Sequence, residues 1–307
     1  MSFAEEVKNE IAHCKPENAA CRFAELAALL CMGGSLILGS RGTIGIEFST
    51  SNNAVARKAL KMWMESFTVR PEVRVRQGLR LRKKNYYILR VTPSPESTAI
   101  LRDLSLFPTD AEFSAIDLRK ADCQRAFLRG AFMGGGSVNQ PKGDYHLELV
   151  TPHYHAARQV SALLMDMELP AGQVMRRGIH VLYYKDSASI EDFLSACGAT
   201  GSAMDLMLKK VERELRNDIN RKVNCETANL TKTVGAAARQ IAAIERLQAA
   251  GILEKLPAPL RQTANLRLSN PELSLAELCA ASPEPISRPG LNNRLRRLVQ
   301  LGEEADK

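Results

Sequence analysis

The chain repeats its own pattern, and this repeat constrains the fold more than any other feature of the sequence. Residues 26–35 read LAALLCMGGS and residues 128–137 read LRGAFMGGGS, so each is an apolar helical segment that ends in small residues. Further along, residues 46–50 (IEFST) match residues 147–151 (LELVT), and each stretch leads into a predicted helix. The two halves of the repeat therefore share one order of elements.

The later strands of the two halves also correspond, because residues 86–91 read YYILRV and residues 179–184 read IHVLYY. Each half predicts the order helix, hairpin, helix, hairpin, helix. We expect an α+β domain at residues 1–202, made of two αββαββα repeats at about 1–110 and 111–202. Glycines in the motif helices would let the two halves approach closely around a pseudo-twofold axis.

Both motif segments resemble the LAGLIDADG-plus-serine motif of homing endonucleases. The matching positions are Leu26, Ala27, Leu29, Gly34 and Ser35 in the first copy, and Leu128, Gly130, Gly136 and Ser137 in the second. The resemblance implies that the two motif helices form the interface between the halves.

In that family the last acid of each motif holds a divalent metal that activates water for phosphodiester cleavage. Here these positions are Gly33 and Gly135, and the earlier acid of the motif is replaced by Cys31 and Met133. Hard divalent cations need oxygen ligands, which glycine does not supply. We therefore expect no metal, no cofactor and no catalytic residue at the degenerate motif, and we expect that the protein is not an enzyme.

A basic ribbon is predicted at residues 70–90, where eight arginines and lysines accompany one acid, Glu72. Apolar and basic residues alternate strictly at residues 73–76 and 79–82, so one face of a hairpin would carry the arginines, with residues 77–78 as the turn. These arginines are Arg74, Arg76, Arg80 and Arg82. Guanidinium groups suit phosphates and guanine edges, so the ribbon either contacts DNA or is a solvated strand face.

Residues 203–232 predict a basic, asparagine-rich helical linker. Leu208, Val211, Leu215 and Ile219 recur at three- and four-residue steps, and a basic stripe follows another face of the same helix. A polar segment of this type either contacts phosphates and sugars or is a solvated connection between domains. The candidate DNA-contacting bases of this linker are Lys209, Arg213, Arg216, Arg221 and Lys222.

An all-α domain is predicted at residues 233–307, with helices near residues 233–250, 258–268 and 287–300. Between the last two, Ser274 begins a capping box that opens a further short helix. Two short helices joined by a tight turn, the second of them basic, read as a helix-turn-helix rather than as a simple helical hairpin.

The last helix would place Leu291, Leu295 and Leu298 inside and its polar side chains outside. Asparagine pairs with adenine and arginine with guanine in the major groove, so this helix is the predicted reading element. Its candidate DNA-binding residues are Arg288, Asn292, Asn293, Arg294, Arg296 and Arg297.

Taken together, the degenerate repeat, the asparagine-rich linker and the terminal helix resemble the WhiA family of sporulation transcription regulators, over roughly residues 1–302. The resemblance implies a DNA-binding regulator of a Gram-positive bacterium, acting in cell division, chromosome segregation or sporulation. It implies double-stranded DNA as the partner, with other transcription factors or RNA polymerase as further partners.

The composition agrees with a folded, nucleic-acid-binding protein without deciding its function. The formal net charge of +8 attracts polyanions, and the seven cysteines show neither a disulfide framework nor zinc-ligand spacing. The start of the sequence lacks a signal peptide pattern, so we expect a cytoplasmic, nucleoid-associated protein without membrane contact. Two rival functions stay open: a metal-dependent nuclease that uses Glu25 or Asp144, and a protein-interaction scaffold whose DNA binding is incidental.

Overall fold

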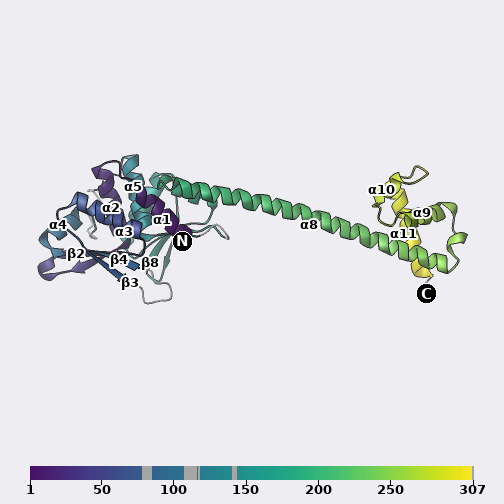
Figure 1. The fold of residues 1–307 in the computed structure, drawn as a ribbon, viewed down its shortest axis with the longest axis horizontal. Coiled ribbons are helices and arrows are strands. Elements are labelled where there is room, and N and C mark those ends of the chain that lie inside the picture. The colour runs from purple at the N-terminus through teal and green to yellow at the C-terminus, as the bar shows by residue number, and fades with distance from the viewer. Residues whose placement is uncertain (78–84, 107–115, 117, 140–143, 306–307) are drawn as a thin grey trace. The chain divides into compact units, whose positions relative to one another are not determined.

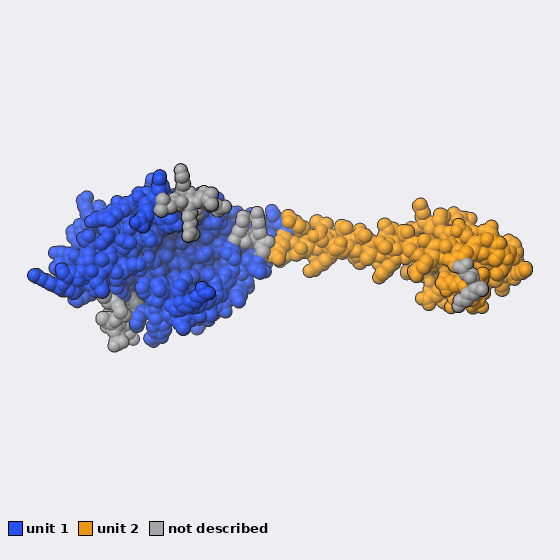
Figure 2. Space-filling view, turned by 90° about the horizontal axis from the view of Figure 1, so that it is seen from below, with its two compact units in different colours: residues 1–212 blue, residues 213–307 orange. Residues whose placement is uncertain are grey.

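The computed structural model describes residues 1–77, 85–106, 116, 118–139 and 144–305. The chain divides into two compact units, Met1–Glu212 and Arg213–Lys307, which Figure 2 shows in blue and orange. Among the described residues, no helix is long and apolar enough to cross a membrane.

Unit 1 contains the predicted repeat, whose order of helices and strands is confirmed (Figure 1). Helix α1 (Phe3–His13) precedes it. The first repeat consists of α2 (Ala19–Gly33), β1 (Gly34–Leu38), β2 (Ile44–Thr50), α3 (Asn53–Ser66), β3 (Glu72–Gln77), β4 (Asn85–Ser94) and α4 (Pro95–Asp103). The second consists of α5 (Ala121–Gly135), β5 (Gly136–Val138), β6 (Leu147–Thr151), α6 (Tyr154–Asp166), β7 (Gly172–Arg176), β8 (Ile179–Tyr184) and α7 (Ser187–Ala196).

The two sheets have matching topology, since their strand orders are β1-β2-β4-β3 and β5-β6-β8-β7. All their pairings are antiparallel, and Gly34 lies opposite Phe48 as Gly136 lies opposite Leu149. In Figure 1 the helices α2, α3 and α5 lie on one side of the labelled strands. The α+β fold class and the αββαββα order are therefore as the sequence predicted.

Local chemistry fixes where the helices of unit 1 begin. The Asn52 side chain accepts a hydrogen bond from Val55 N at 3.0 Å and so caps α3, and Asp186 caps α7 in the same way through Ser189 N at 2.8 Å. Helix α3 then turns Val55 and Trp63 into the core. The indole Nε1 of Trp63 donates to Val69 O at 2.6 Å, so this buried ring keeps a polar partner.

Unit 2 contains the larger part of α8 (Thr200–Ala249), from Arg213 onward. A short 3-10 turn, η2 (Leu253–Lys255), follows, and then α9 (Ala258–Ser269), α10 (Leu275–Ala280) and α11 (Arg288–Glu304). The predicted capping box is present, because Ser274 Oγ accepts from Glu277 N at 3.4 Å and Glu277 Oε2 accepts from Ser274 N at 2.8 Å. Leu291, Leu295 and Leu298 are fully buried, as predicted.

Two helix boundaries differ from the sequence-based expectation. The helical linker predicted at residues 203–232 and the helix predicted near residues 233–250 are one continuous helix, α8. Residues 216–232 contain neither proline nor glycine, and their asparagines weaken a helix by only about 0.7 kcal/mol each at most, so nothing in them ends it. The last helix also runs four residues further than predicted, to Glu304.

Candidate nucleic-acid interface

Helices α2 and α5 lie along each other at the centre of unit 1, and glycines permit the contact. A Cβ on Gly130 would lie 2.0 Å from the backbone oxygen of Glu25, and one on Gly134 would lie 2.5 Å from that of Leu29. A Cβ on Gly33 would lie 2.6 Å from the backbone oxygen of Gly134. The backbones of the two motif helices therefore touch at these positions, where any side chain would force them apart.

The same geometry decides whether a divalent metal fits the degenerate motif. An aspartate at position 33 would place its Cβ against the oxygen of Gly134, and one at position 135 would place it 2.3 Å from that of Val150. Among the residues that the structure describes, no group of three or more His, Cys, Asp or Glu side chains could hold a metal ion. The residues present do not fit a metal here, since both the oxygen donors and the space for them are lacking.

Glu25 is one of the two acids that a nuclease without the motif acids could use. Its side chain is completely buried. It is ion-paired with Lys58, and Arg129 Nε lies 3.4 Å from its Oε2. Burial raises the pKa of the Glu25 carboxyl, and the two neighbouring cations oppose that rise. Glu25 thus joins α2 to α3 and α5 inside the core, where DNA cannot reach it. Asp144, the other acid considered, is exposed just before β6.

The basic ribbon is built differently from the prediction. Strand β3 pairs with β4, with Gln77 opposite Asn85, whereas the sequence suggested residues 79–82 as its partner. Arg80 and Arg82 lie outside the described residues. Arg74 and Arg76 are exposed and lie opposite Ile88 and Tyr86, on the face away from the core.

The valines of β3 share the face of the buried Leu89, yet Val73 is 51% exposed and Val75 is 58% exposed. The core therefore does not extend under β3. Arg74 forms an exposed ion pair with Glu72 at 2.9 Å. In the second repeat, Arg176 of β7 lies 3.2 Å from Glu148, so its charge is partly compensated.

Helix α8 brings only some of the predicted linker bases together. Lys209, Arg213 and Arg216 follow one another at four and three residues and so share an arc of the helix, whereas Arg221 and Lys222 lie on different arcs. The Lys209 ammonium lies 5.5 Å from the centre of the Phe3 ring, so it packs against α1 within unit 1. Arg221 pairs with Asp218 at 3.7 Å.

Helices α10 and α11 form the helix-turn-helix of unit 2. The Ser287 side chain caps α11 by accepting from Gly290 N at 3.3 Å, and Arg288 is exposed in the first turn. Further along, Asn293, Arg296 and Arg297 are exposed at i, i+3 and i+4, opposite the buried leucines. These three side chains form one polar face, which we call the α11 face.

The remaining candidates on α11 lie at the edges of this face. Asn292 and Arg294 are half-buried, and Arg294 lines a shallow hollow with Gln262 of α9 and Ile286 of the turn. Gln300, which sequence reasoning missed, is exposed and 3.5 Å from Arg297 Nη1. Its position seven residues after Asn293 places it on the α11 face, and that spacing is the signal that could have found it.

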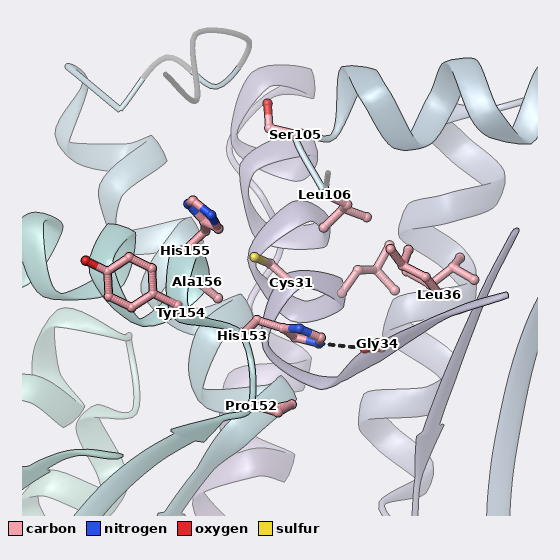
Figure 3. A pocket seen from close by; sticks show the side chains of 12 residues that line it. Cys31, Gly34, Leu36, Ser105, Leu106, Pro152, His153, Tyr154, His155 and Ala156 are labelled. Carbon is pink, nitrogen blue, oxygen red and sulfur yellow. Dashed lines mark hydrogen bonds between the residues drawn. The ribbon is translucent and has the colours of Figure 1, made fainter. Parts of the chain in front are cut away.

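A cavity of about 310 Å³ lies where α2 meets the start of α6 (Figure 3). It is lined largely by apolar side chains, and His153 Nε2 lies 3.4 Å from the backbone oxygen of Gly34. Burial raises the pKa of the Cys31 thiol in its wall to about 12, so the sulfur stays protonated at neutral pH and is a poor nucleophile. The Cys31 thiol is therefore not activated for nucleophilic chemistry in this cavity.

The fold and these surfaces define a protein with two degenerate LAGLIDADG-like repeats followed by a helix-turn-helix domain. Family models for the WhiA N-terminal LAGLIDADG-like domain, the WhiA LAGLIDADG-like domain and the WhiA C-terminal HTH domain match residues 19–107, 124–216 and 219–302. The chain belongs to the WhiA family.

Relatives and solved structures match over nearly the whole chain. The probable cell division protein WhiA of Alkaliphilus metalliredigens is 39% identical, covering 99% of this chain and 98% of the relative. That of Desulforamulus reducens is 40% identical, over 99% and 96%. The crystal structure of full-length DUF199/WhiA from Thermatoga maritima superposes with a TM-score of 0.61 at 27% identity and covers 99% of both chains.

Proposed function

We propose that this protein is a sequence-specific, DNA-binding transcription regulator that reads base edges with helix α11. The observation that carries the proposal is the α11 face, on which Asn293, Arg296 and Arg297 are exposed opposite a fully buried row of leucines. In a helix-turn-helix the second helix lies in the major groove, and its N-terminal half meets base edges. The polar side chains of α11 are the types that recognise adenine and guanine.

The residues of α11 take two roles in this proposal. Asn292 and Asn293 pair with adenine, and Arg288 or Arg296 pairs with guanine, at roughly 1–3 kcal/mol of discrimination for each good pair. Arg294 and Arg297 contact phosphates, which adds affinity without sequence preference.

The bases of unit 1 and of α8 supply further phosphate contacts in this proposal. Arg74 and Arg76 of the ribbon are exposed on one strand face, and Arg80 and Arg82 extend the same alternation in the sequence. On α8 the contacts come from the arc of Lys209, Arg213 and Arg216, and from Arg221 and Lys222. If these groups bind phosphates, each contributes about 0.9 to the slope of log K against log salt.

DNA cleavage is not part of this function. The proposal rests on the glycines at positions 33 and 135 and on the burial of Glu25, which leave no carboxylate pair for a metal at the motif helices. We expect magnesium or manganese to leave the thermal transition unchanged, because a ligand that binds only the native state would raise it. Cleavage of supercoiled DNA that a chelator abolishes would refute this part of the proposal.

The decisive experiment compares binding of variants to a specific DNA site and to a scrambled site, over a range of salt concentrations. Asn293→Ala should relax the preference at one base position and leave weak nonspecific binding nearly intact. Arg297→Ala should weaken binding to both sites alike. Lys255→Ala removes the same charge from the exposed turn η2 and is the control, for which we expect little change. Equal binding to both sites by the unaltered protein would favour an interaction scaffold instead.

The relatives' names point to a role in cell division, and we propose that this chain acts there by regulating transcription, with roles in chromosome segregation or sporulation in a Gram-positive host. It would act on the nucleoid in the cytoplasm, together with other transcription factors or RNA polymerase. A genome-wide occupancy map in the native host tests this. Sites without relation to promoters of division genes would contradict it.

A further inference from the structure

Two buried cysteines lie in contact between the motif helices and have no part in the proposed function. Cys21 of α2 is 0% exposed and Cys123 of α5 is 1% exposed, and their Sγ atoms lie 3.2 Å apart. Both thiols are free. The two residues are 102 positions apart in the sequence, so a bond between their sulfurs would join the two repeats covalently.

The repeat itself brings these two cysteines together. Cys21 lies five residues before Leu26 of the first motif segment, and Cys123 lies five residues before Leu128 of the second. Each cysteine is the third residue of its helix. Where two alike halves pack about a twofold axis, equivalent positions near that axis face each other. The contact of the two thiols therefore follows from the symmetry of the fold.

The two helices are close enough for a covalent bond between the thiols. Further along the same pair of helices, a Cβ on Gly130 would lie 2.0 Å from the backbone oxygen of Glu25, so the backbones of α2 and α5 touch there. A disulfide holds its sulfurs about 2.05 Å apart, so the two thiols have to approach each other by only about 1 Å more. Small rotations of the two cysteine side chains supply this movement.

Both cysteines lie close to the surface although their side chains are covered. Ala20 and Ala121, which stand immediately before Cys21 and two residues before Cys123, are exposed. Helix α5 begins after Lys120, whose side chain makes no capping hydrogen bond. A helix end without a cap opens more easily than the interior of the helix. A small oxidant therefore reaches the pair when this first turn opens, without unfolding of unit 1.

We propose that Cys21 and Cys123 form an intrachain disulfide when a hydroperoxide is present, and that this bond ties α2 to α5. The Cys123 thiolate attacks one oxygen of hydrogen peroxide and becomes a sulfenic acid, and the other oxygen leaves as hydroxide and takes up the proton of the thiol. The Cys21 sulfur then attacks the sulfenic sulfur, whose oxygen leaves as water. Two thiols and one peroxide thus give one disulfide and two waters, and the two electrons that the sulfurs lose reduce the O–O bond.

Burial affects the rate of this reaction and the persistence of its product in opposite ways. Burial, together with the neighbouring Cys123 thiol, raises the pKa of Cys21 to about 11, so little thiolate is present at neutral pH and the disulfide forms slowly. A dithiol is easily regenerated from its disulfide when its thiolate is stabilised, which is not the case here. The pair is therefore suited to sustained oxidation, and its disulfide resists reduction.

The first test oxidises the full chain with hydrogen peroxide and identifies its disulfides by mass spectrometry of a non-reduced digest. The exposed Cys225 is first changed to serine, so that copies are not linked through it. The time course extends until the half-buried Cys279 of unit 2 is fully oxidised. We expect the peptide of Cys21 joined to that of Cys123, with the loss of two hydrogens. Free thiols at both positions, or sulfinic acids in place of the disulfide, overturn the proposal.

The second test asks whether the bond ties the repeats together, through the fluorescence transition of Trp63 in α3. Disulfides that close long loops stabilise a domain enough to raise its midpoint by about 4–16 °C at this size. We expect such a rise after peroxide treatment of the Cys225→Ser chain. The additional change Cys123→Ser should abolish the rise, whereas Cys279→Ser, which removes a thiol of unit 2, should preserve it.

Each variant is compared with its own untreated sample, because a serine in the core of unit 1 lowers the midpoint by itself. This comparison also separates the disulfide from oxidation of methionines, which occurs in the Cys123→Ser chain as well. A midpoint that stays unchanged or falls in a chain whose Cys21–Cys123 bond is shown by mass spectrometry would mean that the bond does not tie the helices, and would overturn that part of the proposal.

Discussion

Replacing Gly130 by alanine tests whether the contact between the two motif helices is as close as the structure shows. Gly130 lies within α5, and an alanine Cβ there would lie 2.0 Å from the backbone oxygen of Glu25 and 3.0 Å from the Cβ of Ala28. Real Cβ atoms essentially never approach a heavy atom more closely than 3.0 Å, so α2 and α5 must separate by about 1 Å at this point.

The size of the effect follows from two opposing contributions. Alanine favours the helix itself by about 0.8–1.0 kcal/mol over glycine. Against this, overpacking a core costs about 1–3 kcal/mol, and a gap of about 1 Å removes up to half of the dispersion attraction between the side chains it separates. Because the obstacle is a backbone oxygen, we expect Gly130→Ala to lower the free energy of unfolding of unit 1 by about 2–4 kcal/mol net.

The single tryptophan of the chain makes this measurement specific, since Trp63 is buried in α3 of unit 1. A loss of about 3 kcal/mol should lower the midpoint of its fluorescence transition by about 6–12 °C for a domain of this size. Gly235→Ala is the matched control, because Gly235 lies within α8 and, apart from the backbone of its own helix, no atom lies within 4 Å of its added Cβ. It should leave the Trp63 midpoint unchanged. A midpoint unchanged or raised by Gly130→Ala would refute the close contact.

Three further predictions concern unit 2, the cysteines and one helix cap. Leu295→Ala removes a fully buried side chain of α11 and should lower the free energy of unfolding of unit 2 by about 2–5 kcal/mol, which would melt its helical signal earlier without moving the Trp63 transition. Burial, together with the Cys123 thiol 3.2 Å away, raises the pKa of Cys21 to about 11. Iodoacetamide near neutral pH should therefore modify the exposed Cys225 and spare Cys21. If mass spectrometry shows that both thiols are modified at similar rates, this prediction is wrong. Hydrogen bonds with Ser274 hold the pKa of Glu277 below its ordinary value of 4.5, so this cap stabilises α10 above pH 4.5 and the stabilisation is lost as the pH falls through the lowered pKa. Glu277→Gln should lack this part of the pH dependence of stability. If the curves of stability against pH for the variant and the unaltered protein superimpose, the cap contributes nothing.

The sequence by itself determined the order of elements in unit 1 and that of the helices after α8 in unit 2. Alternating and helical periodicities are local properties, and they predicted the αββαββα repeats and the inward row of Leu291, Leu295 and Leu298 correctly. The glycines at positions 33 and 135 also showed without a structure that the motif lacks its acids. Each of these features resides in a residue type or in a spacing along the chain.

Tertiary structure alone decided which distant segments meet. The partner of β3 is β4 rather than the nearer alternating stretch, and Glu25 pairs with Arg129, 104 residues away. The sequence does not show whether an acid such as Glu25 faces solvent or a buried guanidinium. The alternation of β3 identifies the two faces of the strand but does not show whether a core covers one of them. Burial and pairing depend on what the rest of the chain places nearby, so no local pattern contains them.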